Sequence, residues 1–144
     1  MERTFHMLLY RAFHAQRGAL RRYLGELGLG AGQPKLLGYL SEKGSGSQRE
    51  LADYFEIDPA AVCRMVDSLQ RGGFVTSRAS DQDKRRDCII LTPLGQAAYE
   101  SWRARCRQVE ARMLDGFDTR ERAQFADYLS RAYRNLKTGE AEQL

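Results

Sequence analysis

A run of three cations, Lys84-Arg85-Arg86, lies within the very polar segment 81–87. Short stretches rich in β-favouring residues, 74–78 and 88–91, flank this segment, so the sequence predicts a β-hairpin with a charged tip. Three cations on such a tip suit insertion into the minor groove of A·T-rich DNA, where negative potential is concentrated. Taken alone, a run of this kind is more often a solvated turn.

An acidic residue, Asp83, precedes Arg85 by two positions. A carboxylate beside a DNA-binding cation is unexpected on simple electrostatic grounds. At this spacing, however, Asp83 can hold the Arg85 guanidinium by a two-pronged ion pair and fix its direction. Asp83 is therefore predicted to support the hairpin tip.

A second candidate site is the segment 58–71, which is predicted to be a helix. Asp58-Pro59 supplies an N-cap and a proline in the first turn, and Gly72-Gly73 ends the helix. At 100° per residue, one face is apolar and the opposite face exposes Arg64 and Arg71. The apolar face consists of Val62, Met65, Val66 and Leu69. The opposite face holds Ala60, Arg64, Asp67 and Arg71, flanked by Ala61, Cys63, Ser68 and Gln70.

The small residues at the start of this helix would let its N-terminus enter a major groove, where the helix dipole favours phosphate. Arg64 can then reach a guanine edge or a phosphate. Solvated surface arginines are the alternative. The candidate DNA-binding residues are Ser47, Gln48, Ala60, Ala61, Cys63, Arg64, Arg71, Lys84, Arg85 and Arg86.

The elements that must position these residues follow from apolar periodicity and capping signals. Ser47 and Glu50 form a capping-box pattern before a short helix with Leu51, Ala52 and Phe55. The predicted helices are 2–24, 34–43, this short helix, 58–71, a long helix from Thr92-Pro93 to about Asp115, and a last helix from Asp118/Thr119 to about 137.

This order predicts a mainly α (α+β) fold: a winged helix-turn-helix with long N- and C-terminal dimerisation helices. One unit is expected over residues 1–137, with dimerisation helices at 2–24 and 93–137, a DNA-binding module at 34–92 and a frayed tail at 138–144. The apolar faces of the terminal helices lack a partner within one winged helix, so a twofold-symmetric homodimer is expected.

The sequence resembles the MarR (multiple antibiotic resistance regulator) family of winged helix-turn-helix transcriptional regulators. The resemblance depends on Leu51-Ala52, the run 57–69 (IDPAAVCRMVDSL), Gly73-Phe74-Val75, and Asp83-Lys84-Arg85 placed seven residues before Leu91-Thr92, with Gly95 beyond. It extends from the first helix to about Leu136.

The resemblance implies a homodimer that binds a pseudo-palindromic operator, usually as a repressor. It also implies that Arg85 enters the minor groove with the support of Asp83, and that Arg64 contacts DNA. Cys63 stands where the family commonly has Thr or Ser, and Gly72 stands where Lys is common, so the operator sequence can differ.

The family commonly holds small phenolic or amphipathic effectors between its dimerisation helices and its winged module. Residue types that suit an aromatic acid are Tyr10, His14, Arg17, Tyr39 and Trp102, all of which are also ordinary helix-packing residues. A small-molecule effector that releases the protein from its operator is therefore expected.

Other chemistries have less support. The three cysteines are odd in number and unclustered, which predicts no disulfide framework; Cys63, near Arg64 and a helix start, leaves a thiol-based redox regulator as an alternative. The only histidines, His6 and His14, are eight positions apart with no cysteine nearby, so no metal site is expected. No cofactor is expected either.

No catalytic grouping or phosphate-binding loop is evident, so the chain is not expected to be an enzyme. Its net charge of +4 suits a polyanionic partner, although residues 45–92 hold seven Lys and Arg against eight Asp and Glu. The lack of a signal-peptide pattern and of a long apolar run predicts a cytoplasmic protein without a membrane span. A winged-helix protein-docking module that does not bind DNA is the remaining alternative.

Overall fold

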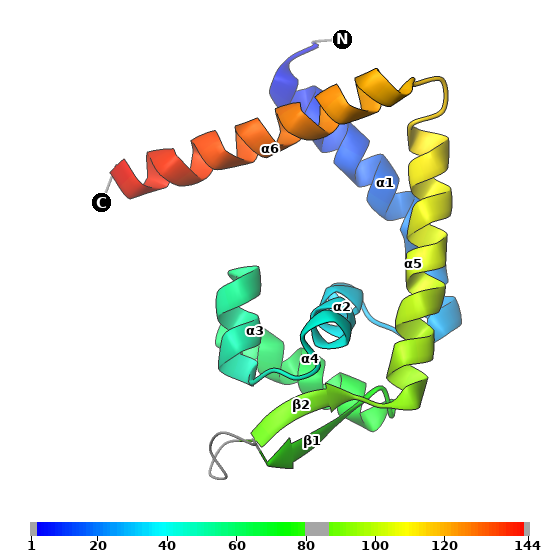
Figure 1. Ribbon diagram of the computed structural model, residues 1–144, viewed down its shortest axis with the longest axis vertical. Helices are drawn as coiled ribbons and strands as arrows, with labels where there is room; N and C mark the ends of the chain where they lie inside the picture. Colours follow the sequence, from blue (N-terminus) through cyan, green and yellow to red (C-terminus); the bar gives the residue numbers. More distant parts are fainter. Residues whose placement is uncertain (1–2, 80–86, 143–144) are drawn as a thin grey trace. The chain divides into compact units, whose positions relative to one another are not determined.

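The computed structural model describes residues 3–79 and 87–142. They divide into two compact units, within residues 1–109 and 110–144, and each unit is described by itself. The elements of the described residues, in chain order, are α1 (Phe5–Leu27), α2 (Gln33–Lys43), α3 (Gln48–Phe55), α4 (Pro59–Arg71), β1 (Val75–Ala79), β2 (Asp87–Leu91), α5 (Pro93–Met113) and α6 (Thr119–Glu142). The predicted mainly α winged-helix fold is confirmed (Figure 1).

Helix α1 begins later and ends later than the predicted range 2–24. Thr4 is its N-cap and accepts a hydrogen bond from the Met7 amide at 3.2 Å. The helix continues past Gly25 and ends where Gly28 adopts a left-handed conformation with φ 75°. Glycine reaches that conformation without steric cost, so Gly28 rather than Leu24 sets the end of the helix.

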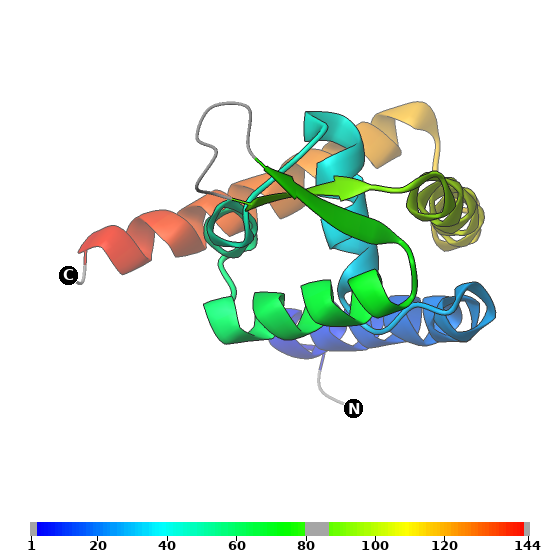
Figure 2. The same cartoon turned by 90° about the horizontal axis from the view of Figure 1, so that it is seen from below.

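The first unit contains a two-stranded antiparallel hairpin in which β1 pairs with β2 from Val75–Leu91 to Ala79–Asp87. Gly46 forms a further bridge to Ile89 on β2, with main-chain hydrogen bonds of 3.1 and 2.8 Å. Figure 2 shows the two strands side by side, with β1 following directly from α4. The hairpin is therefore held to the loop before α3 through β2 and to α4 through β1.

An apolar cluster of described residues holds this unit together. Each of the helices α2, α3 and α4 contributes residues that are almost fully buried, and Phe74, Val75 and Ile89 extend the cluster under the hairpin. The largest fully buried side chains are Leu36, Leu37, Leu51, Leu69, Val62 and Val66. Burying a side chain of this size contributes about 1.5–3 kcal/mol, so the core fixes the mutual positions of α3, α4 and the hairpin.

Helices α1 and α5 are joined in the first unit through Tyr23. Arg22 donates a hydrogen bond of 2.8 Å to the Tyr23 hydroxyl, and the Arg105 guanidinium of α5 lies 4.7 Å from the centroid of the Tyr23 ring. The hydrogen bond to Tyr23 raises the pKa of Arg22, which in any case stays protonated. The Tyr23 side chain on α1 thus contacts an arginine of its own helix and an arginine of α5, and the second contact joins the two helices.

The second unit consists of the end of α5 and helix α6. Asp118 caps α6 by accepting from the Glu121 amide at 2.7 Å, while the Glu121 side chain accepts from the Asp118 amide at 3.0 Å. Arg122 donates to the Leu114 and Phe117 carbonyls, which closes the turn between the helices. The helix reaches Glu142, beyond the end predicted at about 137, so the predicted tail 138–144 is helical in part.

Candidate nucleic-acid interface

Helices α3 and α4 are joined by a tight turn that local sequence dictates. The capping box predicted at the start of α3 is confirmed: the Glu50 amide donates to Ser47 Oγ at 3.1 Å, and the Ser47 amide donates to the Glu50 carboxylate at 3.3 Å. At the other end, Glu56 adopts a left-handed conformation with φ 54° and ends the helix. Asp58 then caps α4 by accepting from the Ala60 amide at 2.9 Å.

The predicted division of α4 into two faces is confirmed. Val62, Val66 and Leu69 are 0%, 2% and 1% exposed, whereas Arg64 and Arg71 are exposed. Neither arginine has a hydrogen bond or an ion pair to another residue that the structure describes. Both guanidinium groups are therefore available to an external anion, at the same side of the helix as Ala60 and Asp67.

The start of α4 combines a proline with two alanines. Ala60 is exposed and Ala61 half-buried, so no bulky side chain covers the first turn. The Asp58 carboxylate satisfies the Ala60 amide and adds a negative charge at this end, which weakens the attraction of the helix dipole for a phosphate. Arg64, one turn further along, restores a positive charge at this end of the helix.

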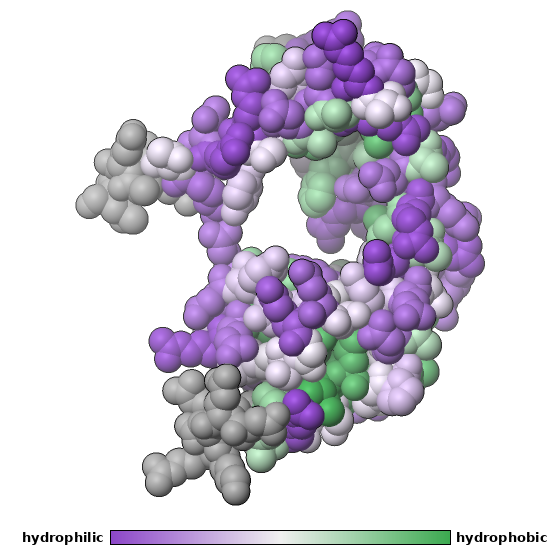
Figure 3. Space-filling view, viewed as in Figure 1, coloured by the Kyte–Doolittle hydropathy of each residue, from purple (hydrophilic) through white to green (hydrophobic). Residues whose placement is uncertain are grey.

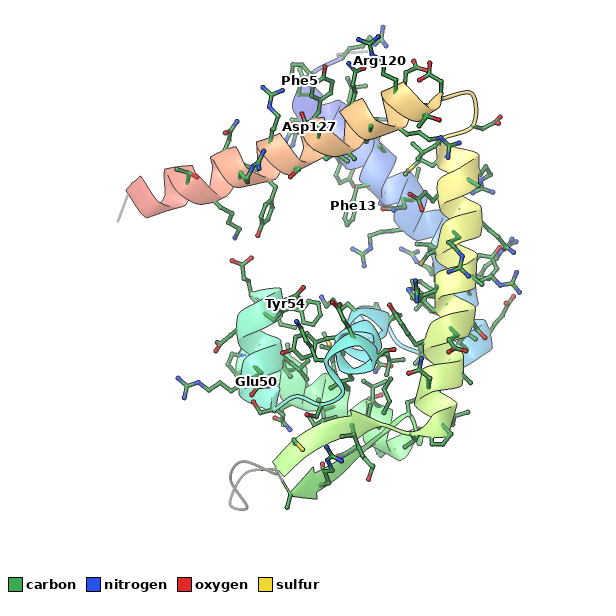
Figure 4. All side chains as sticks on the ribbon, in the orientation of Figure 1. Phe5, Phe13, Glu50, Tyr54, Arg120 and Asp127 are labelled. Carbon is green, nitrogen blue, oxygen red and sulfur yellow. The ribbon has the colours of Figure 1, made fainter. Side chains whose placement is uncertain are left out.

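The start of α3 supplies two further sequence-predicted residues. Gln48 is exposed. Ser47 is half-buried, and its oxygen already accepts from the Glu50 amide, so Ser47 retains only its hydroxyl hydrogen to donate to a phosphate. Figure 4 labels Glu50, the partner of this capping box, on α3.

The hairpin is present as predicted, but its tip lies outside the described residues. Asp83, Lys84, Arg85 and Arg86 belong to the segment 80–86, so their roles in groove contact and wing support stay predictions. The base of the hairpin is firmly held. The Thr92 hydroxyl donates a hydrogen bond of 2.6 Å to the Gly73 carbonyl oxygen. The Thr92 amide donates a hydrogen bond of 3.1 Å to the Phe74 carbonyl oxygen.

The three cysteines lie in different environments and none is in a disulfide. Cys63 is exposed on α4, Cys88 is buried in β2, and Cys106 of α5 is half-buried. Exposure of Cys63 on the same helix as Arg64 means that a modified thiol there would alter the candidate DNA surface.

A cavity of about 570 Å³ opens in the first unit among α1, α2, α3 and α5. Three of the five residues predicted to bind an effector line this cavity: Arg17, Tyr39 and Trp102. Tyr10 and His14 do not line it; they are exposed and stack on each other with ring centroids 5.7 Å apart. The structure therefore places three of the predicted effector-binding residues around one cavity and the other two outside it.

Several cavity residues were not singled out from the sequence. On α5, Tyr99 lies three positions before Trp102, Cys106 lies four positions after it, and Arg103 lies four positions after Tyr99. This helical spacing could have identified them. On α3, Tyr54, labelled in Figure 4, contacts the ring of Tyr39 edge-on, with 5.0 Å between the two ring centroids. That contact joins two helices and has no local signal in the sequence.

Two other kinds of site are not found in the part of the chain that the structure describes. No group of three or more His, Cys, Asp or Glu side chains lies close enough together to hold a metal ion. None of the described helices combines the length and the apolar character needed to cross a membrane.

Comparison with known proteins agrees with this geometry. Residues 27–86 match the model of the MarR family. The chain is 30% identical over 114 residues to the uncharacterized HTH-type transcriptional regulator YdgJ of Bacillus subtilis, covering 79% of this chain and 70% of YdgJ. It is 28% identical over 93 residues to the HTH-type transcriptional regulator BilQ of Clostridium symbiosum, covering 65% of each, just under two thirds of BilQ.

Solved structures show the same fold. A MarR-family regulator from Silicibacter pomeroyi matches with a TM-score of 0.73 and 28% identity, over 89% of this chain and 86% of that one. A mutant MarR from E. coli complexed with operator DNA matches with a TM-score of 0.77 and 23% identity, over 88% and 91%. BpsR of Bordetella bronchiseptica, whose DNA binding is regulated by 6-hydroxynicotinic acid, matches with a TM-score of 0.78 and 22% identity, over 91% and 94%. The chain belongs to the MarR family of transcriptional regulators.

Proposed function

We propose that this protein is a homodimeric, sequence-specific DNA-binding repressor that acts in the cytoplasm on a pseudo-palindromic operator. The observation that carries the proposal is the exposed face of α4, where Arg64 and Arg71 have no partner among the described residues. Free guanidinium groups on a helix of this fold suit base edges and phosphates of DNA. The operator complex of the related MarR supports the same use of the fold.

A homodimer would place two copies of α4 on successive major grooves of the operator. In support, exposed apolar residues occur on both α1 and α6, such as Phe5 at 92% and Leu136 at 71% exposure. Figure 3 shows hydrophobic residues at the surface among mainly hydrophilic ones. Apolar faces of this extent on terminal helices suit packing against a second copy.

We propose further that the cavity binds a small aromatic acid that weakens operator binding. Arg17, Lys35 and Arg103 contribute three cations against Glu42 as one anion, and Tyr39, Tyr54, Tyr99 and Trp102 supply aromatic faces. This lining suits a ring with one negative charge. The cavity borders α3, so an occupant can bear directly on the helix pair that would meet DNA. The regulation of BpsR by an aromatic acid supports this reading.

The decisive experiment is a gel shift of the wild-type protein on the promoter region upstream of its own gene, with and without excess competitor DNA. Binding that resists nonspecific competitor supports the proposed function. A shift that the competitor abolishes would contradict sequence-specific binding, and the absence of any shift would favour the protein-docking module instead. Repeating the shift after mild peroxide treatment, with Cys63→Ser in parallel, tests the thiol-based alternative that the exposure of Cys63 suggests.

A further inference from the structure

A side-chain hydrogen bond joins α4, the proposed recognition helix, to the described part of the hairpin, and the proposed DNA contacts do not include it. Gln70, in the last turn of α4, donates through Nε2 to Ser77 Oγ in the middle of β1, at 2.7 Å. Both side chains are exposed, so this bond does not belong to the buried core.

The register of the hairpin explains why Ser77 faces α4. Ser77 pairs with Ile89, and directly paired residues point to the same side of a sheet. Val75, two positions earlier on that side, is 3% exposed and packs in the core, whereas Ser77 is exposed. Strand β1 therefore leaves the core between Val75 and Ser77, and the bond to Gln70 lies at the point where it leaves.

The two strands of the hairpin differ in the main-chain contacts that they make outside the hairpin. Strand β2 is bridged on its outer side to Gly46 by two main-chain hydrogen bonds. Strand β1 pairs only with β2 in the described sheet, so its outer edge has no strand beside it. A two-stranded ribbon twists and bends readily. A contact from α4 to the middle of β1 opposes that bending, because it fixes the strand beyond its last buried residue.

We propose that Gln70 and Ser77 are positioning residues for DNA binding, which together set the angle between the recognition helix and the hairpin. With α4 seated in a major groove, that angle determines which flanking base pairs the hairpin meets. The inference rests on the proposed function, since the angle matters only to a protein that binds DNA with both elements. It assigns specificity for the operator flanks to a pair of residues outside the segment 80–86.

Three variants test the pair. Gln70→Met keeps the length of the side chain but removes the amide, and Ser77→Ala removes the hydroxyl. Each is expected to weaken operator binding about five- to a hundredfold, the range for loss of one hydrogen bond in each of two subunits. The double variant is expected to bind no more weakly than the weaker single variant, since both remove the same bond.

The preference of the protein for one flanking sequence over another is a second measurement. A general loss of stability would not change this preference. Operators with identical half-sites but A·T-rich or G·C-rich flanks are titrated with each variant. Wild type is expected to prefer A·T-rich flanks, and both variants to lose that preference while keeping their discrimination within the half-site. Ser77→Thr, which keeps a hydroxyl on a β-favouring residue, is expected to restore it. Thr76→Val removes a hydroxyl from the opposite side of the same strand and is the matched control.

The outcomes separate this proposal from the proposed function. If wild type fails to bind any operator specifically, both are overturned. If wild type binds and the two variants keep its affinity and its flank preference, only the positioning role is overturned. The same holds if the effects of the two single variants add in the double variant, because each side chain would then act on DNA independently. Thermal unfolding of each variant, expected within a few degrees of wild type, accompanies the titrations.

Discussion

The hydroxyl of Thr92 donates a hydrogen bond of 2.6 Å to the carbonyl oxygen of Gly73, nineteen residues earlier in the chain. The hydroxyl oxygen of Thr92 also accepts a hydrogen bond of 3.1 Å from the Gly95 amide and thereby caps the first turn of α5. Thr92 thus joins three parts of the first unit: the turn after α4, the end of β2 and the start of α5.

Replacing this hydroxyl is expected to destabilise the protein. Thr92→Val keeps the shape of the side chain but leaves the Gly73 carbonyl and the Gly95 amide without their partner. Loss of a helix cap and a tertiary hydrogen bond is expected to lower the free energy of unfolding by about 1–3 kcal/mol. Chemical denaturation measures the change, with Thr92→Ser, which keeps the hydroxyl, as the control. Equal losses for both variants would mean that the methyl group, not the hydroxyl, matters.

Two glycines are expected to respond to alanine with opposite signs. A Cβ at Gly95 would collide with the Phe74 carbonyl oxygen, which is main chain and cannot move away cheaply. Gly95→Ala is therefore expected to cost about 2–4 kcal/mol of stability. Gly18 is inside α1 with nothing within 4 Å of its Cβ position, so Gly18→Ala is expected to stabilise by about 0.5–1 kcal/mol. Thermal melts of the two variants compare them directly, and a stabilised Gly95→Ala would contradict the close packing of α5 on the hairpin base.

The contrast between these glycines shows which features the sequence can predict. Capping signals are local: Ser47 with Glu50, and Asp58 with Pro59, lie within four residues of each other and predicted the starts of α3 and α4. The two faces of α4 followed from periodicity alone. The close approach of Gly95 to Phe74 joins residues far apart in sequence, so no local pattern predicts it.

The candidate sites also differ in whether local sequence or contacts between distant residues determine them. Arg64 and Arg71 were predicted to be exposed because the opposite face of their own helix is apolar. The cavity depends on contacts between helices, such as Tyr54 against Tyr39, and on the Gly38 backbone, whose Cβ position lies 3.0 Å from the Tyr99 ring. Residue types alone therefore selected Tyr10 and His14, which do not line this cavity, and did not select Tyr99 and Arg103, which do.

The protein is expected to be a dimer in solution. The exposed apolar residues of α1 and α6, among them Phe5, Tyr133 and Leu136, would otherwise face water. Light scattering at micromolar concentration is expected to give twice the chain mass of 16.4 kDa. Replacing Leu136 by Glu is expected to shift the equilibrium toward monomer, whereas a wild-type mass of one chain would reject the dimer.

The cavity is expected to mediate the response to an effector. A panel of aromatic acids at millimolar concentration is expected to include at least one that weakens operator binding. Trp102→Ala and Arg17→Ala are expected to raise the concentration needed about tenfold or more, since each removes a cavity contact of about 1–2 kcal/mol. Arg21→Ala is the charge-matched control, because Arg21 is one turn along α1 and does not line the cavity. An unchanged response in Trp102→Ala and Arg17→Ala would place the effector elsewhere.

The hairpin tip and the recognition helix are expected to contribute different kinds of contact. Arg85→Ala should remove one minor-groove contact from each subunit, which at about 1–3 kcal/mol per contact amounts to roughly 2–6 kcal/mol per dimer. The loss should be largest on A·T-rich flanks, because the minor groove is sensed through its width. Arg64→Ala should weaken binding and change the base preference within the half-site, if Arg64 contacts a base edge.

Asp83→Ala distinguishes support of Arg85 from simple electrostatics. Removing an anion near phosphate should tighten binding if charge alone matters. If Asp83 instead holds the Arg85 guanidinium in one direction, the variant keeps the cation but frees it, and binding should weaken by less than in Arg85→Ala. Titrations of Asp83→Ala, Arg85→Ala and wild type against operator DNA at fixed salt decide between the two. Tighter binding by Asp83→Ala than by wild type would show that the hairpin tip is a charged turn without an internal support.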